Sequence, residues 1–404
     1  MKKIPLVLLA LIALPNLAMT ALYVRDPLLV QRFFTLFNPQ VGDYDTLRPR
    51  EVVDGLAARE LPVATDASRT ISEDALASMR RYAEDQDSFA LVVLHRGVIQ
   101  TEWYAPGWSA DSLTQSQSMH KSVLPLLIGA AIRDGAIDSV DDPAGRYLAE
   151  WRNDPRGEIT LEQLMQMASG LLEYPFSLNP FSDAFGWLFA SDSAPVQLRT
   201  PPAKAPGSLF EYNNVNSELL GLIVERATGK RYAEYFAEKL WRPIGGARAE
   251  LWLDSEGGKA HSSCCLLATA RDWARFGQLL LGRGSLNGRS VVDEDFFEQM
   301  ITASRGSDWY GYQIWLGYSR ELNPRAPLLA GGYQRTEPFD AEDTYYASGF
   351  GAQRVYVVPS AELVIVRMGP SSGRAPVRVT WDNSFLVNTA LRGMREPNAQ
   401  TASR

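Results

Sequence analysis

Two residues three positions apart, Ser118 and Lys121, could together carry out nucleophilic catalysis. A serine hydroxyl is a poor nucleophile until a base removes its proton, and a lysine is such a base only when its pKa falls from about 10.4 toward neutrality. The stretch VLPLLIGAAI at 123–132 is apolar, so we predict that the pair lies at the mouth of a buried helix, where burial lowers that pKa. Residues three apart share a helix face, which lets the amine reach the hydroxyl.

The alternative for this pair is structural. Ser118 would cap a helix, and Lys121 would be a solvated residue of its first turn. The chain contains seven lysines and 33 arginines, and Lys121 is the one lysine with a serine three residues before it. Arginine stays protonated in proteins, so a lysine at this position of an arginine-rich chain favours the catalytic interpretation.

A second motif, Tyr212 and Asn214 in EYNNVN, precedes a predicted helix and is the one Y-x-N among sixteen tyrosines. A tyrosine near a lysine can share its proton and pass it to a leaving group, and an amide can bridge the lysine and a substrate. The motif alone is more typical of a turn with a packed tyrosine.

A third motif, Ala347, Ser348 and Gly349, enters the first strand of a predicted hairpin near the C-terminus. The edge of that strand could bind a substrate backbone by β-pairing. The main-chain N–H of Phe350, just after the glycine, could join the N–H of Ser118 as an oxyanion hole. Taken singly, the motif is also an ordinary strand that contains a glycine.

In this order the motifs resemble the S-x-x-K, Y-x-N and K-T-G motifs of the penicillin-recognising, β-lactamase-like serine hydrolases. The tyrosine form is most similar to class C β-lactamases, to esterases of that fold and to the 6-aminohexanoate-dimer hydrolases. The likeness covers about residues 75–393 and includes ITLEQLMQMASGL, PGSLFEYNNVNSELLGLIVERATGK and ATARDWARFGQLLLGRG.

The resemblance implies a role for each motif residue. Ser118 would be the acylated nucleophile, Lys121 its base partner, Tyr212 the proton shuttle and Asn214 the orienting amide. The third motif would contain Ser348 and Gly349, with Phe350 supplying the second oxyanion N–H. No cofactor and no metal is expected.

Ala347 departs from the family pattern, because the third motif usually has lysine or histidine there. That cation binds the carboxylate of penicillins and of cell-wall peptides, and alanine cannot replace it. Specificity for β-lactams is therefore in question, while acyl transfer is unaffected. His120 points off the face shared by Ser118 and Lys121, so we interpret it as packing or as a cleft wall.

The elements that must position these residues are strands near both chain ends and helices between them. Two hairpins are predicted, one turning at Arg96 and Gly97 and one flanking SAE at 360–362. Residues 118–299 have mostly helical patterns, several of which end in glycine. We therefore predict a two-lobed α+β or α/β fold of the β-lactamase/transpeptidase type. Its antiparallel sheet is built from both chain ends with flanking helices, an all-helical lobe is inserted, and the cleft between the lobes holds the site.

The N-terminus has two lysines followed by Ile4–Val24 without a charge, interrupted by Pro15 and Asn16. Residues 1–24 are predicted as a cleaved signal peptide or a retained membrane anchor, and a buried helix is the third alternative. Residues 25–64 would be a linker that packs on the membrane or on the body. Residues 65–394 would form the hydrolase domain, and 395–404 a loose tail. The folded part would then be periplasmic or secreted, with membrane association through residues 4–24.

Composition excludes some partners. The net charge is −7 with acidic and basic residues interspersed, so no basic surface for nucleic acid is expected. The two cysteines, Cys264 and Cys265, are adjacent, a spacing that we expect to prevent the usual disulfide geometry and to leave them as packed residues. The three histidines show no metal-ligand spacing.

The sequence thus predicts a serine hydrolase that cleaves a small amide or ester, like a 6-aminohexanoate-dimer hydrolase or an esterase. The alternatives are a β-lactamase or D-alanyl-D-alanine carboxypeptidase and, in another class, a catalytically silent binding or scaffold protein of the same fold. No oligomeric state is predicted.

Overall fold

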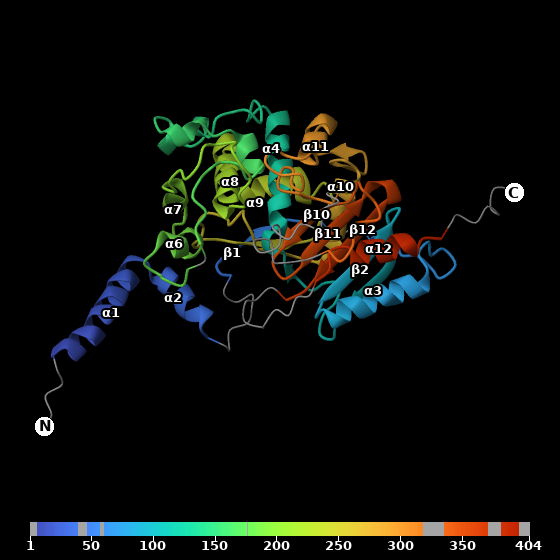
Figure 1. Ribbon diagram of the computed structural model, residues 1–404, viewed down its shortest axis with the longest axis horizontal. Coiled ribbons are helices and arrows are strands. Elements are labelled where there is room, and N and C mark those ends of the chain that lie inside the picture. Colours follow the sequence, from blue (N-terminus) through green and yellow to red (C-terminus); the bar gives the residue numbers. More distant parts are fainter. Residues whose placement is uncertain are drawn as a thin grey trace, which may run out of the picture.

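The computed structural model describes residues 6–38, 47–56, 60–175, 177–317, 335–370 and 381–395. Its main sheet is antiparallel with strand order β3-β2-β12-β11-β10-β9. The strands are β2 (Ala90–His95), β3 (Val98–Tyr104), β9 (Trp315–Leu316), β10 (Tyr345–Gly349), β11 (Gln353–Val358) and β12 (Leu363–Met368). Because β12 pairs with β2, segments from both ends of the chain form one sheet, which confirms the predicted architecture (Figure 1).

The two faces of this sheet pack against different helices, as the period-two alternation of a strand requires. On one face, Leu91 and Val93 join a cluster with residues of α3 (Glu73–Asp85) and α12 (Phe385–Arg392). On the other face, Val92 and Leu94 belong to the large core with α10 (Ala270–Leu281). Gly277 of α10 allows close approach, because a Cβ there would lie 2.4 Å from a methyl group of Val364.

A second sheet, which the sequence patterns did not predict, has strand order β1-β5-β6-β4. Its strands are β1 (Arg50–Val53), β4 (Thr114–Gln115), β5 (Ala249–Trp252) and β6 (Leu266–Ala268). β1 comes from the segment 25–64 that we predicted as a linker, and it pairs with β5 along its whole length. β4 ends directly before the Ser118 segment, so this sheet supports the candidate nucleophile.

The residues between β4 and the C-terminal strands are largely helical. The α-helices are α4 (Leu124–Arg133), α5 (Leu161–Met165), α6 (Asp183–Phe189), α7 (Ala194–Leu198), α8 (Asn214–Thr228), α9 (Tyr232–Phe236) and α11 (Glu294–Met300). Short helical segments and a short hairpin lie between them: η1 (Gln117–Val123), η2 (Ala144–Arg146), η3 (Ala149–Trp151), η4 (Pro155–Glu158), η5 (Ala237–Trp241), β7 (Ser285–Leu286) and β8 (Arg289–Ser290). A further turn, η6 (Pro359–Ala361), joins β11 to β12. α8 begins at the N-cap Asn213 and ends at Gly229, whose φ of +67° suits a helix C-cap.

At the N-terminus, α1 (Leu6–Arg25) projects from the body and α2 (Pro27–Leu36) lies against it (Figure 1). Leu29 and Val30 of α2 pack with Phe185 and Ala190 of the helical region. Within the described ranges, no helix is long and apolar enough to cross a membrane. Of the predicted tail, Arg395 donates its main-chain N–H to Thr70 O, and residues 396–404 lie outside the described residues.

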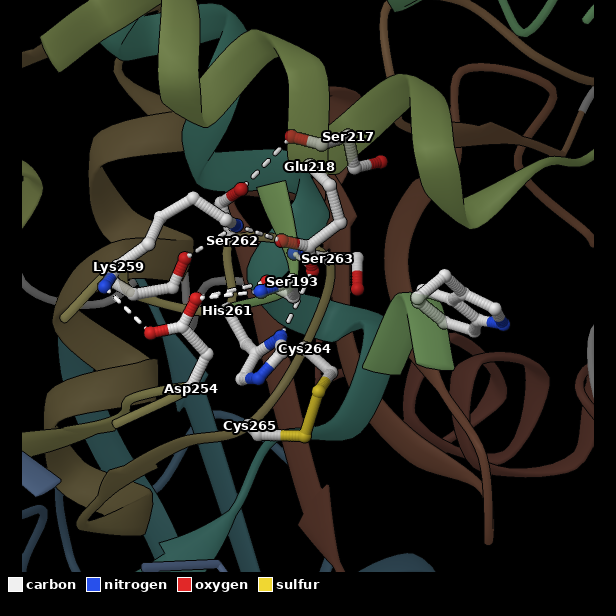
Figure 2. A network of polar contacts seen from close by, with 12 residues as sticks. Ser193, Ser217, Glu218, Asp254, Lys259, His261, Ser262, Ser263, Cys264 and Cys265 are labelled. Atoms are coloured by element: carbon white, nitrogen blue, oxygen red, sulfur yellow. Dashed lines mark hydrogen bonds and ion pairs between the residues drawn. A yellow bond between two sulfur atoms is a disulfide. The ribbon is translucent and has the colours of Figure 1, made fainter. Parts of the chain in front are cut away.

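The expectation for the cysteines was wrong, since Cys264 and Cys265 are joined by a disulfide (Figure 2). Cys265 has a φ of +77°, a left-handed backbone conformation that non-glycine residues seldom adopt, and this allows the neighbouring side chains to meet. Both side chains are buried in a small cluster with Leu47, Trp252 and Leu267.

Candidate active site

Ser118 and Lys121 lie together on η1, a 3₁₀ turn that leads into α4. Side chains three apart nearly eclipse in a 3₁₀ helix, so the lysine lies directly over the serine. Lys121 Nζ is 2.9 Å from Ser118 Oγ. Ser118 is half-buried and Lys121 is 1% exposed, so the hydroxyl is accessible while the amine is enclosed.

The backbone just before Ser118 is strained at Gln117 and is held by hydrogen bonds at Ser116. Gln117 has a φ of +50°, a strained conformation of the kind often found at functional sites. Ser116 exchanges hydrogen bonds with Leu266: its main-chain N–H donates to Leu266 O, and its Oγ accepts from the Leu266 N–H. These contacts with the end of β6 hold the turn that presents Ser118.

The environment of Lys121 favours a neutral amine. Burial lowers its pKa from 10.5 to about 7, and the negative charge of Glu218 partly opposes this. Nζ also donates to the main-chain carbonyl of Ser263 at 2.6 Å. A neutral amine that donates one hydrogen to this carbonyl can direct its lone pair at the Ser118 hydroxyl.

Tyr212 makes a side-chain hydrogen bond with Ser118. Lys121 Nζ is 5.2 Å from the centre of the tyrosine ring. Burial raises the pKa of Tyr212 to about 12, although the Ser118 bond and the charge of Arg354 lower it. The phenol is therefore protonated at neutral pH and can donate a proton, and Trp315 and Tyr310 pack against its ring.

Asn214 is the first residue of α8 and is half-buried. The neighbouring Asn213 is the N-cap: its Oδ1 accepts the Val215 N–H, and its amide donates to Leu171 O and Leu172 O. Among the described residues, no hydrogen bond joins Asn214 to Lys121. The structure thus brings Tyr212 onto the serine but does not bond the predicted orienting amide to the lysine.

The third motif lies in β10 beside the nucleophile turn. A Cβ on Gly349 would lie 2.3 Å from Ser116 O, so only glycine allows this approach. β9 pairs with β10 at Tyr345 and Tyr346 and does not extend along Ser348 and Gly349. Phe350, which follows, is 43% exposed. Ala347 is fully buried and brings no charge to the site.

Arg354 is a cation near this motif that the sequence patterns did not single out. It is opposite Ser348 in the β10–β11 register, and its guanidinium donates to Gly349 O and to Asn383 Oδ1. Its side chain is 1% exposed. A buried arginine bonded to the motif's own backbone holds the strand end and is not presented to solvent.

His120 points away from the serine, which confirms its interpretation as packing. Its Nε2 is 2.9 Å from Tyr232 Oη, and burial lowers its pKa to about 3. In the part of the chain that the structure describes, no group of three or more His, Cys, Asp or Glu side chains could hold a metal ion. Ser118, Lys121 and Tyr212 are the side chains that the structure brings together here.

Comparison with known proteins agrees with this geometry. The family model described as Beta-lactamase matches residues 78–388. The chain is 25% identical to the 6-aminohexanoate-dimer hydrolase of Paenarthrobacter ureafaciens over 338 residues, which cover 79% of this chain and 82% of that protein.

Two solved structures share the fold. A Bacillus anthracis protein provisionally assigned as a 6-aminohexanoate-dimer hydrolase superposes with a TM-score of 0.68 at 23% identity, covering 87% of this chain and 91% of that one. EstCE1, described as a hydrolase with promiscuous acyltransferase activity, superposes with a TM-score of 0.59 at 12% identity, covering 79% and 97%.

Proposed function

The chain belongs to the β-lactamase family of serine hydrolases, and on that premise we propose that it cleaves a small, uncharged amide or ester through an acyl-enzyme on Ser118. The observation that carries the proposal is the enclosed Lys121 amine, 2.9 Å from an accessible serine hydroxyl. A lysine buried without such a role would only destabilise the fold, because its charged form is poorly solvated there.

In the proposed reaction, neutral Lys121 takes the proton of Ser118 as Oγ attacks the substrate carbonyl carbon. The main-chain N–H groups of Ser118 and Phe350 stabilise the oxyanion. The tetrahedral intermediate then collapses, and the proton passes from Lys121 through the Tyr212 hydroxyl to the departing amine or alcohol. Water, deprotonated along the same route, releases the acid product and regenerates the serine.

The substrate class is inferred from two features. The relative from Paenarthrobacter ureafaciens is named for hydrolysis of a 6-aminohexanoate dimer, which supports an amide or ester substrate for this chain. Ala347 provides no cation for a carboxylate at the third motif. The lack of a cation there favours substrates without a carboxylate at this position over penicillins and D-alanyl peptides. The charge-free N-terminal segment supports a location outside the cytoplasm, as a secreted or an anchored enzyme.

A fluorophosphonate probe tests the nucleophile. We expect it to label the wild-type protein and to leave Ser118→Ala unlabelled with its fold intact. Ser122→Ala is the matched control, because Ser122 lies on the same turn but donates to Gln313 O away from Lys121. An unlabelled wild-type protein would favour a silent binding protein, and labelling of Ser118→Ala would place the nucleophile elsewhere. A panel of neutral esters and amides, with a penicillin included, then ranks the substrates.

A further inference from the structure

A buried ion pair joins Glu218 of α8 and Lys259 of the segment before β6 (Figure 2). The Glu218 side chain is fully buried, and the Lys259 side chain is 9% exposed. The proposed reaction uses neither residue. Removing two charges from water is costly, and such pairs are often no more stabilising than apolar residues of similar size. The pair therefore needs an explanation beyond stability.

One residue connects this pair to the active site. The main-chain N–H of Ser263 donates to Glu218 Oε1 at 3.1 Å, and the carbonyl of the same residue accepts from Lys121 Nζ at 2.6 Å. Ser262, the preceding residue, donates its hydroxyl to Ser217 O of α8. α8 thus anchors this segment from one side, while Lys121 contacts it from the other.

Two histidines and one tyrosine near the pair, His261, His120 and Tyr232, are uncharged at neutral pH. His261 Nδ1 lies 3.6 Å from Glu218 Oε1, too far for a full hydrogen bond, and burial lowers the pKa of His261. His120 is neutral because its pKa is about 3, and burial raises the pKa of Tyr232 well above its usual value.

The charge at and around the Lys121 amine therefore depends mainly on three groups: the amine itself, Glu218 and Lys259. Burial opposes ionisation of Glu218, but the charge of Lys259 keeps the pKa of the carboxyl below its usual value, so the carboxyl is ionised. Other charged groups surround the pair: Asp254 accepts the Lys259 main-chain N–H, and the charge of Arg32 acts on His261. The carboxyl groups of Glu225 and Asp192 also interact with the charge of Lys259.

Resting on the proposed acyl-enzyme chemistry, we propose that Glu218 is a positioning residue for that reaction. It fixes Ser263 so that the carbonyl takes one hydrogen of the Lys121 amine and leaves the lone pair directed at Ser118. Its charge, balanced by Lys259, also sets the pH at which Lys121 releases its proton. The negative charge of Glu218 raises the pKa of Lys121, and the positive charge of Lys259 lowers it.

The test is the pH dependence of fluorophosphonate labelling at Ser118 in the full-length protein. Labelling needs neutral Lys121, whose pKa of about 7 predicts a rate at pH 6 about one tenth of the plateau. A single buried charge that is separated from the Lys121 amine by one residue, here Ser263, shifts the pKa of that amine by about one unit. The limb of the pH profile is the pH range over which the labelling rate rises to its plateau, and in Glu218→Gln this limb should therefore move to lower pH. The ratio of the rate at pH 6 to the rate at pH 9 should rise about fivefold, and the plateau rate should be lower.

Lys259→Gln should shift the same limb in the opposite direction, because it leaves the Glu218 charge unbalanced. Its ratio of rates at pH 6 and pH 9 should fall about tenfold. Glu225→Gln is the matched control: Glu225 is a partly buried glutamate of the same helix that accepts the Tyr232 N–H and interacts with the charge of Lys259. Among the described residues it has no hydrogen bond to Ser263, and Glu218, not Glu225, is the charge that acts on Lys121. Its limb should stay in place.

A purely structural pair would lower the plateau in both variants without moving either limb, and that result would overturn the proposal. So would shifts in the same direction. If a single variant does not fold, as judged by circular dichroism, Glu218→Gln combined with Lys259→Met removes the pair as a unit. Its limb should move to lower pH by less than one unit, and an unmoved limb refutes the proposal. Failure of the wild-type protein to label would instead refute the acyl-enzyme function itself.

Discussion

Replacing Lys121 with methionine should abolish activity and yet stabilise the protein at neutral pH. The reason is linkage between protonation and folding. In the unfolded chain the lysine has its ordinary pKa of 10.5, whereas burial lowers the pKa in the folded protein to about 7. Between these values the unfolded state binds one proton more, so the wild-type protein gains stability as the pH rises. The free-energy cost of burying Lys121 is therefore full below pH 7 and vanishes above pH 10.5.

The size of the effect follows from the two pKa values. At pH 7 the penalty is about 4 kcal/mol, and at pH 10 it has fallen to about 1 kcal/mol. Methionine removes the penalty but leaves the Ser263 carbonyl without its amine donor, which costs about 1–3 kcal/mol at either pH. Lys121→Met should therefore be about 1–3 kcal/mol more stable than wild type at pH 7 and equal or less stable at pH 10.

Urea unfolding of both proteins at pH 7 and pH 10 measures this difference. The cost of the lost hydrogen bond is common to both conditions and cancels when the two values of ΔΔG are subtracted, which leaves about 3 kcal/mol from the titration alone. Lys204→Met, at a surface lysine paired with Glu211, controls for the loss of a lysine as such. If ΔΔG for Lys121→Met changes by less than about 0.5 kcal/mol between the two pH values, the lysine is not held neutral and the account of its activation is wrong.

Three further outcomes are expected. Lys121→Arg should label with a fluorophosphonate as poorly as Lys121→Ala, because a guanidinium stays protonated; substantial labelling would mean that the base lies elsewhere, with Tyr212 the first candidate. Gly349→Ala should slow labelling and lower the free energy of unfolding by about 1–3 kcal/mol, since its Cβ would lie 2.3 Å from Ser116 O; unchanged melting and labelling would exclude the close approach. A penicillin should have a kcat/KM at least about tenfold to a hundredfold below that of a neutral ester, because no cation at position 347 binds its carboxylate; equal values would mean that another residue does so.

Local patterns predicted much of the fold. The turn at Arg96 and Gly97 and the strand-forming, β-branched and aromatic residues on either side specify the β2–β3 hairpin without reference to the rest of the chain. Ser118 and Lys121 are also a local pair, so their approach follows from spacing within one turn. The apolar stretch that follows them correctly indicated a buried lysine.

Contacts between distant segments could not be predicted in the same way. Glu218 meets Lys259, 41 residues later, and Ser263 reaches Lys121 from 142 residues away. One signal was present for Glu218: it lies in a helix that is buried all round from Val215 to Val224, where an ionised side chain must find a partner. The second sheet escaped prediction because β4 and β6 are only two and three residues long, too short for an alternating pattern.

The acyl-enzyme itself gives the most direct test of the account. The full-length protein would be mixed with p-nitrophenyl acetate, quenched in acid within one turnover, digested and analysed by mass spectrometry. The account predicts an acetyl group on the hydroxyl of Ser118 in the wild-type protein, and none on that peptide in Lys121→Met. Ester hydrolysis with the acetyl group on another residue, or with no covalent intermediate while Ser118→Ala keeps its full rate, would contradict it.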